Sequence, residues 1–273
     1  NFFSRAGLWF RLWFNSFDAV IDLHSYPFST TTTLLSVFSG APIRIGFWAA
    51  GDFREYSGVS ERVFNRGTNA PSENLPEVQK SFLLIKQLFP QAKLDLSKTK
   101  LPSVSKETTA SVKSFYAKAG IGARDKVLGI HPTLQKKDNR WSQEKYMELI
   151  KGLASVKDLK VIVVHGKGET TELERFQKLT IGFSNVFTLP NDDLFFILEA
   201  AKGFDGMVCN DSGIMHLCAW VTPLFAVFGP SNTKRWGPQN QNGIKHHVFQ
   251  TKDGLCDSVK PGQVAHVVRK DLF

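Results

Sequence analysis

The segment Lys126-Val-Leu-Gly-Ile-His131 opens the part of the sequence that decides the fold. It is a short, β-rich apolar run, and a helical pattern follows it. Similar pairs of apolar run and helical pattern recur along the chain as far as residue 228. Such alternation is typical of a parallel sheet with crossover helices. We therefore predict an α/β fold, with a complete doubly wound domain in the second half of the chain.

The other expected elements follow from the same two patterns. Strands are predicted at residues 18–23, 43–47, 126–131, 160–165, 186–189, 207–210 and 224–228. Helices are predicted at residues 30–38, 75–89, 106–119, 142–154, 170–179, 192–201 and 214–220. Only two of these strands and two of these helices precede the stretch 88–105, which contains Pro90, Pro102 and weak periodicity. This stretch is the best linker candidate, so we predict a partial domain over 1–104 and a second domain over 105–273.

Composition excludes several classes of protein. The chain has 273 residues, of which 42% are hydrophobic and 22% charged, so it is neither disordered nor of low complexity. Three cysteines, Cys209, Cys218 and Cys256, are too few and too scattered for a disulfide scaffold or a structural zinc site. The net charge of +9 is spread along the chain without a basic stripe, which argues against a nucleic-acid-binding protein.

The first fourteen residues are rich in Phe and Trp and contain Arg5 and Arg11. Two interpretations are open: an amphipathic helix packed on its own domain, or a segment that touches a membrane surface. We expect no spanning helix. The longest apolar rival, residues 214–230, is divided by Pro223 and by the pair Gly229-Pro230.

The strongest chemical signal is the stretch Asn210-Asp-Ser-Gly-Ile-Met-His216, where a predicted strand turns into a helix. The backbone N–H groups at such a helix start favour a phosphate. Ser212 can add a hydroxyl donor, Gly213 permits close approach of a ligand, and His216 lies on the first turn. Asp211 would repel phosphate and is better suited to accept hydrogen bonds from sugar hydroxyls. The alternative is an Asp-Ser helix cap followed by a core histidine.

Other strand ends carry polar residues as well. Arg140 is suited to bidentate contact with a diphosphate, whereas Lys136 and Lys137 read as a solvated basic loop. Glu169 is open to two interpretations, as a helix cap or as a ligand of ribose hydroxyls. His131 and His165 end buried strands and are interpreted as core histidines. The pair His246-His247 has no ligand-type neighbours in the sequence, so we expect no metal site.

Five of these segments together resemble glycosyltransferase family 9, typified by the ADP-heptose:lipopolysaccharide heptosyltransferases. They are Gly129-Ile-His-Pro, Asn139-Arg-Trp, Gly166-x-Gly168-Glu169, Asn210-Asp-Ser-Gly-x-x-His216 and Phe228-Gly-Pro. The segments Phe17-Asp-Ala-Val-Ile-Asp-Leu23 and Arg44-Ile-Gly-Phe47 are similar to strands of the family's acceptor domain. The resemblance covers nearly the whole chain.

The resemblance implies a GT-B fold, with two Rossmann-like domains and parallel sheets. The domain 105–273 would bind the nucleotide-sugar donor, and 1–104 would belong to the acceptor side; a further expectation is that the last helix packs back on the first domain. The implied reaction is an inverting transfer of a heptose, or a similar sugar, from an ADP-sugar to a lipopolysaccharide core. The acceptor would be an anionic lipid-linked saccharide at the cytoplasmic membrane face, contacted transiently by a cytoplasmic enzyme without metal or cofactor.

The resemblance also implies roles for the residues already singled out. Ser212 and Gly213 would hold the diphosphate, and Asp211 and His216 would contact the donor sugar or its phosphates. The pocket for the diphosphate would be lined by Thr133 and Arg140, and Glu169 would reach the ribose of the nucleoside.

Two departures from the family pattern matter. The family usually has Lys two residues before the Trp, where this chain has Asn139, with Arg140 adjacent. The family also begins with a strand and a Gly-Asp pair whose Asp is the proposed base, and nothing before Asp18 matches it. We therefore expect the first domain to lack its first strands and the base to lie upstream of Asn1. The alternative function is a nucleotide-sugar-binding pseudoenzyme without turnover.

Overall fold

The computed structural model describes residues 16–24, 29–48, 57–69, 71–239 and 243–273. The aromatic segment at the start of the chain, for which two interpretations were open, lies outside these residues. The chain divides into two compact units, Asn1–Asp95 and Leu96–Phe273. The division falls within the expected linker, which contains a 3-10 turn at Leu96–Lys98. No helix among the described residues is long and apolar enough to cross a membrane.

The first unit contains a parallel three-stranded sheet in the order β1-β2-β3. Its strands are β1 (Ala19–Ile21), β2 (Ile43–Trp48) and β3 (Arg66–Asn69), and its helices are α2 (Thr30–Phe38), α3 (Ser57–Val63) and α4 (Glu77–Ile85). Ile45 and Phe47 of β2 pack with Leu84 of α4 in a small buried core. Strand β3 and helix α3 were not predicted, because Arg66-Gly-Thr-Asn69 contains no apolar run that would mark a strand.

The second unit contains a parallel six-stranded sheet. Its strands are β4 (Lys126–Ile130), β5 (Leu159–Val163), β6 (Val186–Thr188), β7 (Gly206–Asn210), β8 (Leu224–Val227) and β9 (His247–Phe249). Their spatial order is β6-β5-β4-β7-β8-β9, which is the doubly wound order in which the direction of winding reverses between the first and fourth strands. The predicted α/β class with parallel sheets is therefore confirmed.

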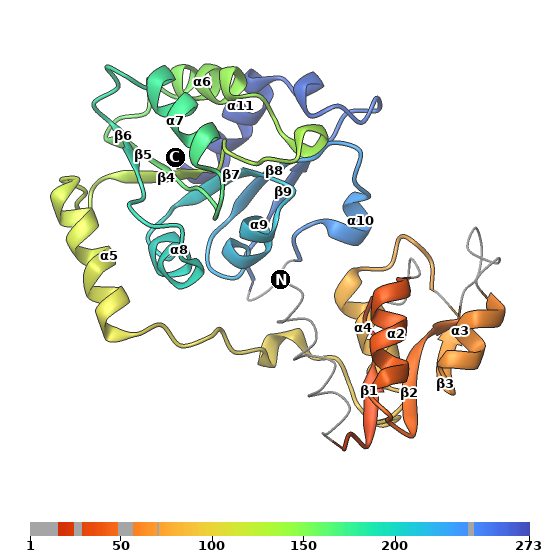
Figure 1. Ribbon diagram of the computed structural model, residues 1–273. Helices are drawn as coiled ribbons and strands as arrows, with labels where there is room; N and C mark the ends of the chain where they lie inside the picture. The colour runs from red at the N-terminus through yellow and green to blue at the C-terminus, as the bar shows by residue number, and fades with distance from the viewer. Residues whose placement is uncertain (1–15, 25–28, 49–56, 70, 240–242) are drawn as a thin grey trace. The chain divides into compact units, whose positions relative to one another are not determined.

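Helices cover both faces of this sheet (Figure 1). One face carries α6 (Gln143–Gly152), α7 (Thr170–Leu179) and α11 (Pro261–Leu272), and the other carries α5 (Lys106–Lys118), α8 (Leu194–Ala201) and α9 (Gly213–Cys218). Neighbouring strand residues alternate between the two cores: Leu128 lies in the first and Val127 in the second. This two-residue period reflects burial of both faces of the sheet.

The short elements complete the second unit. They are the 3-10 turns at Lys137–Asn139 and Cys256–Ser258 and helix α10 (Thr233–Trp236). Helix α11 packs against α6 within this unit, with Val264, Ala265 and Val268 buried in the same core as Leu149. The expectation that the last helix also packs back on the first domain stays a prediction.

Candidate active site

The reversal of strand order between β4 and β7 sets the place of the candidate site. In open α/β sheets, ligands bind outside the carboxyl ends of the strands at such a reversal. The segments that leave the sheet there begin at His131 after β4 and at Asp211 after β7. The loops after β5 and β8, which neighbour these strands, contribute Glu169 and Ser231.

Asn210, the last residue of β7, fastens the loop after β4 to the neighbouring strand. Its side chain is fully buried. The amide oxygen accepts a hydrogen bond from the Trp141 backbone N–H at 2.8 Å, and the amide nitrogen donates to the His131 carbonyl at 3.1 Å. The loop between His131 and Trp141 is therefore held at both ends by one side chain. Trp141 is buried and donates its indole N–H to the Val259 carbonyl at 3.1 Å.

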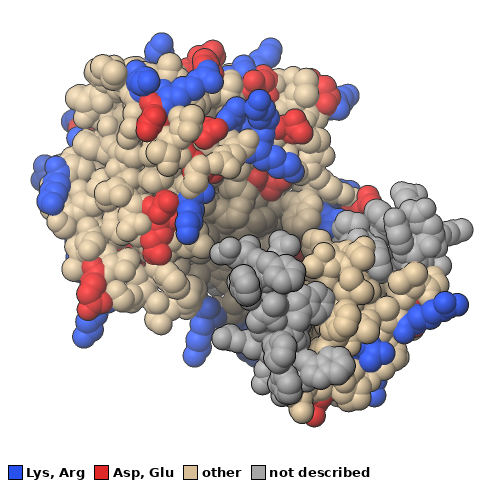
Figure 2. Space-filling model, in the orientation of Figure 1, with Lys and Arg blue, Asp and Glu red and all other residues tan. Residues whose placement is uncertain are grey.

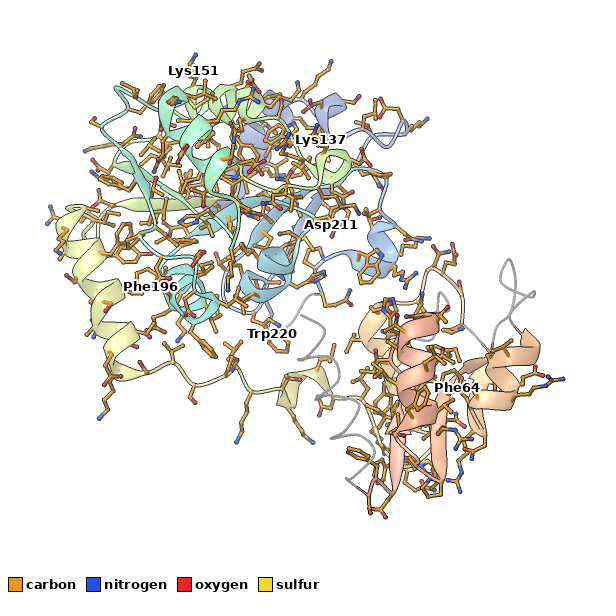
Figure 3. The ribbon with its side chains drawn as sticks, in the orientation of Figure 1. Phe64, Lys137, Lys151, Phe196, Asp211 and Trp220 are labelled. Carbon is orange, nitrogen blue, oxygen red and sulfur yellow. The ribbon has the colours of Figure 1, made fainter. Side chains whose placement is uncertain are left out.

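Asn139 joins the loops after three strands. Its amide nitrogen donates to Oδ2 of Asp211 at 2.9 Å and to Oγ of Ser231 at 3.0 Å. Asn139 is 3% exposed, and its amide oxygen is buried with no hydrogen-bond partner among the described residues. Figure 3 labels Asp211 near Lys137, which lies in the same 3-10 turn as Asn139. The carboxylate of Asp211 is thus oriented by a neutral amide.

Gly229 permits this arrangement of loops. A Cβ atom on it would lie 2.3 Å from the backbone oxygen of Asp138 and 3.1 Å from Sγ of Cys256. A backbone oxygen at 2.3 Å cannot move away by a change of side-chain rotamer. Only glycine therefore fits between the loop after β8 and the loop after β4. The close approach explains the glycine in Phe228-Gly-Pro.

Helix α9 begins at the centre of the candidate site. Ser212 is its N-cap, with extended backbone and a hydroxyl oxygen that accepts from the Met215 N–H at 3.3 Å. Gly213 is exposed, and a Cβ added to it would meet no atom within 4 Å. His216, also exposed, lies one turn further on. Partial desolvation lowers the pKa of His216, and the Asp211 carboxylate offsets part of that effect.

Glu169 accepts hydrogen bonds from three groups at one carboxylate oxygen. They are His131 Nε2 at 3.0 Å, Thr133 Oγ1 at 2.6 Å and the Gly166 N–H at 2.7 Å. Burial alone would raise the pKa of Glu169, but the hydrogen bond and electrostatic attraction of His131, with the bonds from Thr133 and Gly166, outweigh it and hold the pKa at about 2. Although Glu169 occupies the N-cap position of α7, its side chain makes no capping hydrogen bond.

Comparison with known proteins identifies the family to which this arrangement belongs. The profile of glycosyltransferase family 9 (heptosyltransferase) matches residues 5–257. The chain belongs to glycosyltransferase family 9. No curated protein matches the sequence.

Solved structures of this family share the fold. The glycosyltransferase family 9 protein from Veillonella parvula is 19% identical, with a TM-score of 0.76 over 100% of this chain and 79% of that one. The E. coli ADP-heptose lipopolysaccharide heptosyltransferase II is 18% identical, with a TM-score of 0.68 over 99% and 81%. The E. coli heptosyltransferase WaaC with ADP-2-deoxy-2-fluoro heptose is 20% identical, with a TM-score of 0.69 over 98% and 76%. The predicted GT-B type is confirmed.

In this family 9 chain, the predicted site residues form two groups and an outlier. Asp211, Ser212, Gly213 and His216 lie together at the start of α9. Thr133 and Glu169 are hydrogen-bonded to each other, and the Thr133 hydroxyl is fully buried in that contact. Glu169 occupies the N-cap position of α7 without a capping bond from its side chain, and its contact with ribose stays a prediction.

Arg140 is the outlier. Its guanidinium lies 3.6 Å from the Glu172 carboxylate on α7 and donates to the Leu134 carbonyl at 3.4 Å. Together with Arg175 and Thr171, Arg140 lines a cavity of about 270 Å³ between the starts of α6 and α7. Its assigned contact with a diphosphate stays a prediction.

Sequence reasoning missed three side chains that organise the site. Asn210 and Asn139 were not identified as links between loops, and His131 was interpreted only as a core residue. His131 is buried, but it contacts both Glu169 and Ser212. The signal available in the sequence was the recurrence of polar residues at four strand ends. Which of them meet depends on strand order, which the sequence pattern does not give.

Lysines and arginines are interspersed with acidic residues over the visible surface of the second unit (Figure 2).

His247, one of the two adjacent histidines, pairs with Asp271 at 2.6 Å and stacks on Phe225. Among the described residues, no group of three or more metal-ligating side chains lies close enough together to hold an ion.

Proposed function

We propose that this chain transfers a heptose, or a similar sugar, from an ADP-sugar to a lipopolysaccharide core saccharide, with inversion at the anomeric carbon. The observation that carries the proposal is the cluster at the start of α9. It occupies the strand-order reversal of a nucleotide-binding type of sheet in a family 9 chain. Structures of E. coli WaaC contain ADP or ADP-2-deoxy-2-fluoro heptose, which supports ADP-heptose as the donor.

In this proposal, Ser212 and Gly213 hold the diphosphate. The open space above Gly213 allows a phosphate oxygen to approach the backbone, and the Ser212 hydroxyl is half-exposed beside it. Asp211 accepts hydrogen bonds from hydroxyls of the donor sugar, since its carboxylate is half-exposed and oriented by Asn139. His216, exposed on the first turn, contacts the sugar or the phosphates.

Glu169 and Arg140 serve the rest of the nucleotide. The three hydrogen bonds to Glu169 all go to Oε2, so Oε1 is the oxygen left for ribose hydroxyls. Thr133 acts by holding that carboxylate in place. Arg140 reaches the diphosphate by exchanging its 3.6 Å ion pair with Glu172 for a phosphate.

The reaction forms a bond from an acceptor hydroxyl oxygen to the anomeric carbon while the bond from that carbon to the phosphate oxygen breaks. The acceptor hydroxyl gives its proton to a general base, and the departing nucleoside diphosphate keeps the electrons of the broken bond and gains negative charge. Donors fixed in advance at the diphosphate stabilise that developing charge more than they stabilise the bound donor. The acceptor is proposed to be an anionic lipid-linked saccharide that the enzyme meets at a membrane surface.

Calorimetric titration with ADP-heptose, ADP and UDP-sugars tests the donor. Binding of the ADP compounds with little binding of UDP-sugars supports the proposal, and absence of binding to any of them contradicts it. Product formation with a heptose acceptor then tests transfer. Binding without transfer would instead favour a nucleotide-sugar-binding protein without turnover.

A matched pair of variants separates the loss of a donor contact at the site from the general effect of replacing Asp by Asn. Asp211→Asn should weaken donor binding or turnover. Asp158→Asn makes the same exchange at an exposed residue just before β5, at the amino end of the sheet, where a positive φ of 57° suits Asn. It should leave both binding and turnover unchanged.

A further inference from the structure

A chain of hydrogen bonds runs from a buried carboxylate to a half-exposed hydroxyl at the candidate site. Glu169 Oε2 lies 3.0 Å from His131 Nε2, and His131 Nδ1 lies 3.4 Å from Ser212 Oγ. The ring of His131 is 1% exposed and Glu169 is 7% exposed. Ser212, which is half-exposed, is therefore the member of the chain most open to a ligand.

The position of one proton on His131 follows from its partner. The Thr133 hydroxyl and the Gly166 N–H donate to Oε2 of Glu169 and favour the ionised carboxylate, which can only accept hydrogen bonds. Nε2 of His131 must then carry a hydrogen and donate it to Glu169. The backbone keeps the ring in place, since the His131 N–H donates to Val208 and the His131 carbonyl accepts from Asn210.

The state of Nδ1 determines where the Ser212 hydrogen points. When Nδ1 carries a lone pair, it accepts from the Ser212 hydroxyl, whose hydrogen is then directed into the protein. When Nδ1 carries a second hydrogen, it donates to Ser212 Oγ, and the Ser212 hydrogen is free to point outward. The Met215 N–H bond to Oγ at 3.3 Å is compatible with both states.

We propose that His131 is a positioning residue that takes up one proton at Nδ1 when a nucleoside diphosphate binds, so that Ser212 becomes a hydrogen-bond donor to a phosphate oxygen. The inference rests on the proposed nucleotide-sugar site. The proton comes from solvent and forms one N–H bond, and no bond to the ligand is made or broken. The charge of the Glu169 and His131 pair changes from −1 to zero, which favours an anionic ligand.

The physical cause is the chemistry of the phosphate. Its oxygens only accept hydrogen bonds. If the Ser212 hydrogen pointed to His131, the Ser212 oxygen would face a phosphate oxygen with no hydrogen between them, which is repulsive. Binding is therefore stronger to the doubly protonated ring, and by linkage the ligand raises the protonated fraction of His131.

Three other titratable groups in and below the site favour their uncharged forms. Burial raises the pKa of Cys209 and Tyr146, so both are uncharged near neutral pH. Desolvation lowers the pKa of His216, which favours its neutral form. Three more titratable groups lie on the surrounding elements. They are Asp211 after β7, His165 after β5 and Arg140, whose guanidinium pairs with Glu172.

Proton uptake can be measured on the full chain by calorimetry. ADP-ribose is the probe, because its diphosphate is a diester that does not titrate near neutral pH, and ADP is compared with it. Titrations at one pH in buffers of different ionisation enthalpy give the number of protons bound. We expect uptake of up to about one proton per ligand, with log Kd rising with pH at a slope equal to that uptake.

Three variants locate the proton. His131→Gln keeps an amide N–H for Glu169 but cannot gain a proton, so uptake and the pH slope should disappear. Ser212→Ala removes the group that the proton serves and should also reduce the uptake. His165→Gln is the matched control: this strand-end histidine bonds the Leu189 carbonyl at 3.1 Å, and its replacement should leave uptake unchanged.

Nitrogen-15 spectra of histidine-labelled wild-type protein provide a readout that does not depend on the folding of a variant. The free protein should show His131 protonated at Nε2 alone, and the complex should show both nitrogens protonated. Equal uptake in wild type and His131→Gln, or an unprotonated Nδ1 in the complex, overturns the inference alone. Failure of the wild type to bind either ADP-ribose or ADP overturns the inference together with the proposed function.

Discussion

Replacement of Gly213 by alanine separates ligand contact from protein stability. The backbone at Gly213 is not in the left-handed region, and the added methyl group would meet no protein atom within 4 Å. The substitution therefore introduces no strain or clash. By lowering the entropy of the unfolded chain it should stabilise the fold by about 0.4–1 kcal/mol. For a chain of this size that corresponds to a rise in Tm of about 1–4 °C.

The same methyl group should oppose donor binding. A phosphate oxygen that accepts from the backbone here must come within about 3 Å of the N–H, and the new carbon would occupy part of the approach. We expect a loss of at least about tenfold in ADP affinity, equivalent to about 1.4 kcal/mol. Thermal unfolding and calorimetric titration with ADP, on the same preparation, measure the two effects.

Gly262 supplies the control. It is exposed near the start of α11, its backbone is not left-handed, and an added Cβ would likewise meet no atom within 4 Å. Gly262→Ala should raise Tm by a similar amount and leave ADP affinity unchanged. Wild-type affinity in Gly213→Ala would refute close approach of the diphosphate at this residue. A fall in Tm would refute the reading of an unstrained, open position.

Three further predictions concern the neighbouring side chains. Asp211→Asn should weaken donor binding about tenfold with little change in Tm, because the side chain is half-exposed and, among the described residues, accepts one hydrogen bond, from Asn139; calorimetry and thermal unfolding measure both, and a large loss of Tm would indicate a structural role. His216→Ala should reduce donor affinity severalfold, with stability unchanged to within about 0.5 kcal/mol since the ring is exposed; equal affinity in titrations at pH 7 would contradict contact with the donor. Glu169 has a folded-state pKa of about 2 against an ordinary 4.5, so the stability it adds is full above pH 4.5 and is lost as pH falls toward 2, by an amount on the order of 2–3 kcal/mol. Urea unfolding between pH 2.5 and 7 should show this loss in wild type and a smaller loss in Glu169→Gln, and equal pH dependence would contradict it.

Local pattern predicted several elements with accurate bounds. Helices α2 and α7 have the predicted bounds, and strand β4 is one residue shorter than predicted. These segments combine an apolar period with a clear stop, such as Gly40 after α2, which has a positive φ of 66°. Strands β3 and β9 were missed because they are short and polar in part, and pairing with a neighbouring strand is what makes them strands.

The cluster Asp211, Ser212, Gly213 and His216 could be predicted because its members are close in sequence and one helix start places them together. The links through Asn139 and His131 could not. Asn139 is 72 residues from Asp211 and 92 from Ser231, and His131 is 38 from Glu169 and 81 from Ser212. No local pattern relates residues at such separations.

The sequence by itself determined the α/β class, the family and the polar residues at the strand ends, because these depend on short-range periodicity and on motifs within single segments. Only the tertiary structure decided that β4 lies between β5 and β7 and that Asn210 ties the loop after β4 to β7. Strand order is set by how crossover helices pack on the two faces of the sheet, which is a property of the whole domain. That order brings Glu169, His131 and Ser212 into one hydrogen-bonded chain, so a histidine that the sequence presents as a core residue becomes part of the candidate site.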